Sequence, residues 1–211
     1  MQNFLFDFDG TLANSGPTVT MAAQEAFKAC NLRIPTDQEI LDHMGLTIEK
    51  FFPQLAPTAS AQTMQKVYQE FRHFADGTAR LRTQLFPGVK DTLAHLFTEH
   101  KQLFIVSSNL SVNILNHLHR FGITDEFVQV IGSDMVANPK PAPDAVNQVV
   151  NNYQLDPHET IVIGDARYDL QMGQAAGVKT GGATWGAFNV QSLRAEHPDY
   201  LLKQPKELLK I

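Results

Sequence analysis

Hydrophobic residues occur along this chain in short runs that alternate with helix-like segments. The runs lie at residues 4–6, 103–106, 128–131, 161–163, 178–180 and 200–202. Between them, apolar positions recur at helical spacing over 88–100, 111–121, 144–152 and 170–176. Short apolar strands that alternate with helices are typical of βα units, which build a parallel sheet. We therefore expect an α/β fold with a doubly wound, Rossmann-like core.

One stretch, residues 16–82, does not follow this alternation. It shows four helical segments without a convincing strand, and Thr36 with Glu39 has the form of a capping box for the second segment. An all-helical insert of this size needs a small core of its own. The predicted organisation is an α/β core domain at 1–14 and 84–211, with a smaller helical domain at 15–83 inserted after the first strand.

Composition and charge narrow the class of partner. A formal net charge of −5 over 211 residues offers no electrostatic footprint for nucleic acid or for an anionic membrane. The apolar runs are too short to cross a bilayer, and the N-terminus lacks the pattern of a signal peptide. The single cysteine, Cys30, lies in an apolar helical pattern, and we expect it to be a small core residue. These features predict a cytoplasmic protein with a small-molecule partner.

Polar side chains gather where the predicted strands end. Ligands of open α/β sheets bind beyond the carboxyl ends of the strands, so these positions are candidates for a site. The candidates are Asp7 and Asp9 after the first strand, Ser107, Ser108 and Asn109 after the second, Lys140 after the third, and Asp165 with Asp169 after the fourth.

Several carboxylates at one edge of a sheet repel one another. Two unit charges about 4 Å apart cost on the order of 4 kcal/mol at an effective dielectric of 20, so the cluster needs a cation. Hard oxygen ligands favour magnesium, which binds through carboxylates together with substrate phosphate oxygens. One carboxylate of such a group can attack phosphorus, while a second, protonated carboxyl donates its proton to the leaving oxygen. Lys140 and the Ser107 hydroxyl would then hold the phosphoryl group.

Each of these residues has a plainer interpretation when it is taken alone. An Asp after a strand is commonly a turn or cap residue, Ser107 could cap the next helix, and Lys140 could be a solvated loop lysine. Taken one by one, these plainer interpretations do not explain why all four groups of residues follow strands of one sheet. The combination therefore favours a phosphoryl-transfer site.

Four ordered motifs resemble the signatures of the haloacid dehalogenase superfamily, in particular its magnesium-dependent phosphatases. They are DFDGTLANS, VSSN, KPAPD and IGDARYD, which begin at Asp7, Val106, Lys140 and Ile163. The helical insert is similar to the cap domain of that family. The segments VKTGGATWG and HPDYLL resemble the closing part of the phosphoglycolate phosphatase-like branch.

The resemblance implies a role for each matched residue. Asp7 would be the nucleophile that becomes an aspartyl-phosphate, and Asp9 would be the general acid and then the general base. Asp165 would bind Mg²⁺ together with the Asp7 carboxylate and the Asp9 backbone carbonyl. The remaining matched residues would hold the phosphoryl group or support the metal: Ser107, Ser108, Asn109 and Lys140 for phosphate, Asp169 for the metal.

The resemblance also implies a reaction class and leaves alternatives. An Asp at position 9 suits phosphate esters, so we expect a phosphomonoesterase for small molecules such as phosphoglycolate. A sugar-phosphate mutase of the beta-phosphoglucomutase type, an inorganic pyrophosphatase and a catalytically silent regulatory module stay open. Monomer and homodimer stay open as well. The candidate substrate contacts from the cap are His43, Gly45, Lys50 and Arg72, with His73 nearby on the last cap helix.

Overall fold

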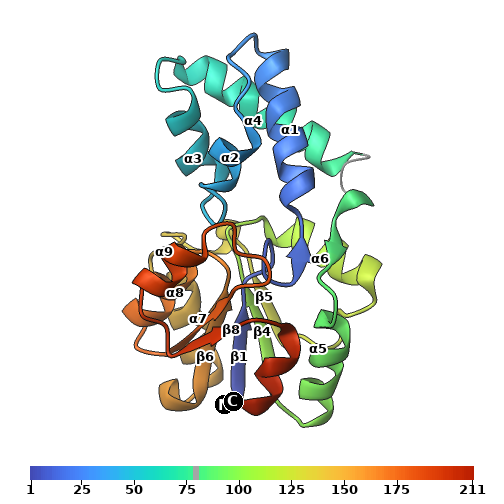
Figure 1. Cartoon of the computed structure of the whole chain (residues 1–211), viewed down its shortest axis with the longest axis vertical. Helices are drawn as coiled ribbons and strands as arrows, with labels where there is room; N and C mark the ends of the chain where they lie inside the picture. The colour runs from blue at the N-terminus through green and yellow to red at the C-terminus, as the bar shows by residue number, and fades with distance from the viewer. Residues whose placement is uncertain (78–80) are drawn as a thin grey trace.

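The core of the molecule is one sheet of six parallel strands. In this computed structural model, which describes residues 1–77 and 81–211, the strand order is β5-β4-β1-β6-β7-β8 (Figure 1). The strands are β1 (Asn3–Phe6), β4 (Gln102–Val106), β5 (Gln129–Ile131), β6 (Thr160–Gly164), β7 (Lys179–Ala183) and β8 (Tyr200–Leu202). Each of them overlaps one of the predicted runs, which confirms the α/β sheet.

Helices cover both faces of this sheet, because successive side chains of a strand point to opposite faces. Phe4 and Phe6 pack in an apolar cluster with α5 and α6, whereas Leu5 packs in a second cluster with α7 and α8. The doubly wound prediction is therefore confirmed. The helices are α5 (Val89–Thr98), α6 (Ser111–Phe121), α7 (Asp144–Tyr153), α8 (Arg167–Ala175) and the short α9 (Val190–Ala195).

The helices α1 to α4 stand above the carboxyl ends of the strands, as can be followed in Figure 1. They bury an apolar cluster of their own, in which Phe27 and Phe52 are fully covered. The predicted capping box is present, with Thr36 and Glu39 exchanging hydrogen bonds. The last predicted segment, 59–82, is helical up to Asp76, and its residues 78–80 lie outside the described residues. The helices are α1 (Gly16–Ala29), α2 (Asp37–Leu41), α3 (Ile48–Leu55) and α4 (Ala61–Asp76).

The two chain segments that lead to and from these helices pair with each other. β2 (Ala13–Asn14) and β3 (Gln84–Leu85) form a two-stranded antiparallel ribbon. This ribbon lies beside the predicted boundaries at 15 and 83, and the separate apolar cluster supports the predicted division into core and cap. We call the α/β unit the core and the helical unit the cap, and we propose that they divide at these boundaries.

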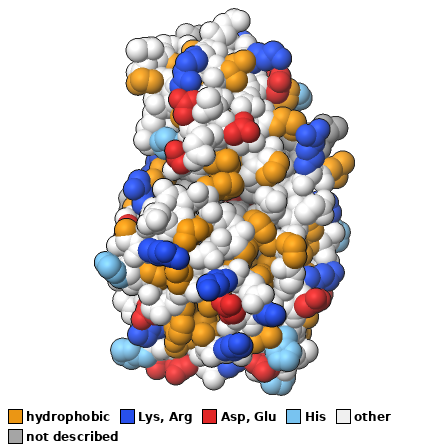
Figure 2. Space-filling view, in the orientation of Figure 1, with side chains coloured by type: hydrophobic (Ala, Val, Ile, Leu, Met, Phe, Trp, Pro, Cys, Tyr) orange, Lys and Arg blue, Asp and Glu red, His pale blue; other side chains and the backbone are white. Residues whose placement is uncertain are grey.

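The surface in Figure 2 carries both signs of charge. Blue and red side chains lie interspersed on this face of the core and of the cap. Within the described residues, no helix combines the length and the apolar character that a membrane crossing requires.

Candidate active site

Asp7 stands at the carboxyl end of the central strand β1. Its side chain is buried, and Oδ1 accepts hydrogen bonds from the Phe8 backbone N–H at 2.7 Å and from Lys140 Nζ at 2.8 Å. Two donors on one oxygen fix the orientation of this carboxylate. A carboxylate held in one orientation at the centre of the sheet edge is well placed to act as a nucleophile.

Lys140 links two of the predicted carboxylates. Its ammonium contacts Asp7 at 2.8 Å and Asp169 at 2.5 Å, and all three side chains are buried. Burial opposes the ammonium charge, but Asp169 and Asp7 outweigh it and hold the pKa of Lys140 above its usual range. Burial also raises the pKa of Asp169 to about 6, although Lys140 acts in the opposite direction. Lys140 is therefore a fixed positive charge beside Asp7.

Asp165 approaches the backbone of the first loop closely. The Thr11 hydroxyl donates to its Oδ1 at 2.9 Å, and a Cβ at Gly10 would lie only 2.3 Å from its Oδ2. Gly10 also has a φ of +84°, which favours glycine. Burial, followed by the charges of Asp169 and Asp7, raises the pKa of Asp165 well above its usual range. The loop is built to bring this carboxylate against the end of β1.

Three buried carboxylates meet at this point. Oxygens of Asp7, Asp165 and Asp169 all lie within 4.8 Å of one another, and Lys140 supplies the one ammonium in contact with them among the described residues. The unbalanced negative charge and the hard oxygen donors fit a divalent cation. The donor set therefore fits a metal site. Asp169, for which the sequence predicted a supporting role, lies close enough to take part in it.

Asp9 lies two residues beyond Asp7 and is half-buried. Asn109 donates to its Oδ2 at 2.8 Å, and the Asn109 backbone N–H donates to Ser107 Oγ at 3.3 Å. Burial raises the pKa of Asp9, and the neighbouring Asp7 charge adds to the effect. A raised pKa favours the protonated carboxyl, which is the form that a general acid requires.

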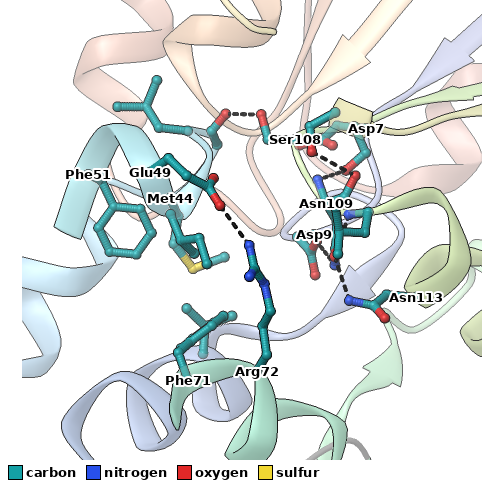
Figure 3. A pocket seen from close by; sticks show the side chains of 17 residues that line it. Asp7, Asp9, Met44, Glu49, Phe51, Phe71, Arg72, Ser108, Asn109 and Asn113 are labelled. Carbon is teal, nitrogen blue, oxygen red and sulfur yellow. Dashed lines mark hydrogen bonds and ion pairs between the residues drawn. The ribbon is translucent and has the colours of Figure 1, made fainter. Parts of the chain in front are cut away.

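A cavity of about 110 Å³ lies between the core and the cap (Figure 3). Its core side is lined by residues at the strand ends, including Asp7, Asp9, Ser107, Ser108 and Asn109. Of the predicted cap contacts, the structure brings Gly45 and Arg72 to this cavity.

His43 and Lys50 point to other partners. The His43 ring bonds to the Glu39 carbonyl at 2.8 Å and to the Gln54 side chain at 3.2 Å. Lys50 Nζ donates to two core carbonyls, those of Pro139 at 3.0 Å and Lys140 at 2.9 Å. Neither residue lines the cavity over Asp7. His73 also lies outside the residues that line it.

Ser108, predicted to bind phosphate, lines the cavity, and its hydroxyl donates to the Gly45 carbonyl at 2.7 Å. Together with the Lys50 bonds, this contact ties the cap to the core on either side of the site. The structure shows the cap in contact with the strand ends, with a partly open cavity between them.

The residues of the site that sequence reasoning missed include Thr11, Glu49 and the apolar side chains that line the cavity from the cap. Thr11 lies inside the first motif, but its bond to Asp165 depends on the geometry of the loop, which the sequence does not show. Glu49 forms an ion pair with Arg72 at 2.8 Å across the cavity wall. No sequence signal links these two residues, which belong to different helices.

Comparison with known proteins gives the family. Residues 4–183, most of the chain, match the family described as haloacid dehalogenase-like hydrolase. The chain belongs to this family. It is therefore a hydrolase, and the resemblance of the four motifs is confirmed.

Individual members of the haloacid dehalogenase-like family resemble the chain over nearly all of its length. A phosphoglycolate phosphatase of Vibrio vulnificus is 29% identical over 98% of this chain and 93% of its own. A pyrophosphatase PpaX of Bacillus pumilus is 30% identical over 98% and 94%. A solved structure from Bacteroides fragilis, described as a haloacid dehalogenase-like hydrolase, matches with a TM-score of 0.92 at 29% identity, covering 98% of this chain and 99% of that one. The predicted class, a hydrolase of phosphoric esters, is confirmed.

Proposed function

We propose that this hydrolase cleaves small-molecule phosphomonoesters through a covalent phosphate on Asp7, with Mg²⁺ in the acidic cluster. The observation that carries the proposal is the buried group formed by Asp7, Lys140, Asp165 and Asp169 directly beside Asp9. It joins an oriented nucleophile, a fixed cation and an acid whose pKa is raised.

The first step would transfer the phosphoryl group to the protein. An Asp7 carboxylate oxygen attacks phosphorus, the ester P–O bond breaks, and Asp9 donates its proton to the departing alkoxide. Lys140 and Asn109 lie next to these groups and would balance negative charge and hold Asp9 in place. A poor leaving group such as an alkoxide needs that proton, which is why the raised pKa of Asp9 matters.

The second step would restore Asp7. The Asp9 carboxylate takes a proton from water as the water oxygen attacks phosphorus. The bond between phosphorus and Asp7 then breaks, and inorganic phosphate leaves. Asp9 is protonated again and ready for the next cycle. The cap excludes other solvent while it stays in contact with Ser108 and the loop at Lys140.

The metal site would be formed by Asp7 and Asp165, with Asp169 beside them. A divalent ion bound there supplies charge neutralisation for the phosphoryl oxygens. Mg²⁺ is the proposed ion, because the donors are hard oxygens. Thr11 would hold the Asp165 carboxylate in the orientation that binding needs.

The most direct test measures phosphate release from a panel of phosphomonoesters and pyrophosphate, with Mg²⁺ and with a chelator. Phosphate release that requires Mg²⁺ and is lost in Asp7→Asn supports the proposal. Borohydride trapping during turnover should place the modification on Asp7. Equal activity of Asp7→Asn and wild type would overturn the covalent route.

Asp9→Asn separates the acid role from a structural one. In a single turnover, release of the alcohol from alkyl phosphates should slow by about 10²–10⁴-fold, the usual contribution of general acid catalysis. The release of nitrophenolate from p-nitrophenyl phosphate in the first step should slow much less, because nitrophenolate leaves without a proton. An equal slowing of this first step for both substrates would contradict the assignment.

Pyrophosphate hydrolysis is a second candidate, because the PpaX relatives carry that name at 30% identity. The same panel separates it from monoester hydrolysis by the preferred substrate. The mutase alternative predicts an isomerised sugar phosphate among the products. The regulatory module predicts no turnover by wild-type protein with Mg²⁺ on any member of the panel.

A further inference from the structure

The cap side of the active-site cavity is apolar. Six of the residues that line it from the cap carry hydrophobic side chains, and Figure 3 shows three of them, Met44, Phe51 and Phe71, across from the polar core side. The other three are Val19, Leu46 and Ile48. The phosphoryl group would sit at Asp7, so this apolar wall surrounds the space left for the leaving group.

The cap contributes one cation to this cavity, and that cation already has an anionic partner. Among the described residues that line the cavity, Arg72 is the single Lys or Arg, and its guanidinium contacts Glu49 Oε1 at 2.8 Å. Figure 3 shows the two side chains extended toward each other between the apolar wall and Asp9. Over the described residues that line the cavity, the formal charge of the cap wall is therefore zero.

The other cap cations predicted to contact substrate are turned elsewhere. Lys50 donates to the carbonyls of Pro139 and Lys140, and the His43 ring bonds to the Glu39 carbonyl and Gln54. An anionic leaving group would thus have to take Arg72 from Glu49. Arg72 and Glu49 are 43% and 51% exposed, so separating them costs little by itself. The main cost is repulsion, because the Glu49 carboxylate would then lie beside the substrate's own negative charge.

We infer that the natural leaving group is an uncharged and largely apolar alcohol, and that Glu49 excludes carboxylated and phosphorylated leaving groups by occupying Arg72. This inference rests on the proposed phosphatase function and specifies its substrate class. It differs from the substrates in the relatives' names, since glycolate and phosphate are both anionic leaving groups.

Matched substrates test the inference on the wild-type enzyme. Phenyl phosphate and 4-carboxyphenyl phosphate differ by one carboxylate, and that carboxylate makes the phenolate a slightly better leaving group. Wild-type enzyme with Mg²⁺ should nevertheless prefer phenyl phosphate by about tenfold or more in kcat/KM. For n-alkyl phosphates, kcat/KM should rise by up to about fourfold per buried methylene until the cavity is full.

Charge variants of the ion pair test the role of Glu49. Glu49→Gln frees Arg72 and should move the preference toward 4-carboxyphenyl phosphate by about tenfold, mostly through KM. Arg72→Gln leaves Glu49 unpaired and should move the preference in the opposite direction. The matched control is Glu70→Gln, because Glu70 carries the same charge on α4 and lies outside the residues that line the cavity.

The possible outcomes separate the inference from the proposed function. A wild-type preference for 4-carboxyphenyl phosphate or for phosphoglycolate would overturn the inference and leave the phosphatase function standing. An unchanged preference in Glu49→Gln, or equal shifts in Glu49→Gln and Glu70→Gln, would overturn the role of Glu49. No phosphate release from any monoester would overturn the proposed function, and the inference with it.

Discussion

The buried acidic cluster predicts an unusual pH dependence of stability for the metal-free protein. The pKa of Asp169 rises from 3.8 to about 6 on folding, mainly because of burial. The pKa values of Asp9 and Asp165 move in the same direction. A carboxyl with a raised pKa binds more protons in the folded state than in the unfolded state. Its contribution to stability is therefore present below pH 3.8 and is lost as the pH rises through about 6.

The size of the effect follows from the shift of Asp169. A difference of about 2.2 units at 1.36 kcal/mol per unit corresponds to about 3 kcal/mol over the whole transition. Between pH 5 and pH 7, Asp169 alone accounts for roughly 1 kcal/mol. Asp9 and Asp165 add to this loss with the same sign. Below pH 4.5, exposed carboxylates with a lowered pKa act in the opposite direction, because their protonation destabilises the folded protein. Glu39, whose pKa is lowered to about 2, is an example, so pH 5 is the useful lower limit.

Urea denaturation with a chelator should therefore show a lower free energy of unfolding at pH 7 than at pH 5. Saturating Mg²⁺ should remove this difference, because a bound cation requires ionised carboxylates. Asp165→Asn removes one titrating carboxylate and should reduce the slope of stability against pH. Asp199→Asn should not, because Asp199 accepts from the Thr180 backbone N–H and does not belong to the acidic cluster. A metal-free stability that is constant or rises from pH 5 to pH 7 would refute the reasoning.

Three further variants test single contacts of the site. Lys140→Met leaves buried carboxylates without their cationic partner and should lower the free energy of unfolding of the metal-free protein by about 3–5 kcal/mol in urea denaturation. A loss below about 1 kcal/mol in the same experiment would contradict the burial argument. Thr11→Val removes the donor to Asp165 and should weaken Mg²⁺ binding by about 10–100-fold in calorimetry, and an unchanged affinity would count against that role. Lys50→Met should raise KM by about fivefold with kcat nearly constant, because it removes two of the hydrogen bonds that join the cap to the core. Lys66→Met, at an exposed position of α4, is the matched control, and equal effects of the two variants would refute a specific role of the Lys50 contacts.

The positions of the strands and of the acidic residues followed from local pattern. Buried parallel strands appear as short apolar runs because both faces are covered, and each run ends where a polar residue meets the sheet edge. Asp7 and Asp165 belong to adjacent strands that point the same way, so their convergence follows from the topology. The helical insert could also be predicted from the sequence, because its apolar positions recur at helical spacing only.

The partners of the cap side chains were decided by tertiary structure. Periodicity shows which side of a helix is polar, but it does not show what lies opposite that side. Lys50 and Arg72 therefore appeared equivalent as candidate contacts, although one reaches core carbonyls and the other pairs with Glu49. The same holds for Ser108, whose hydroxyl meets the cap because the two units approach at that point. Such contacts join residues far apart in the chain, and only the packing of cap against core brings them together.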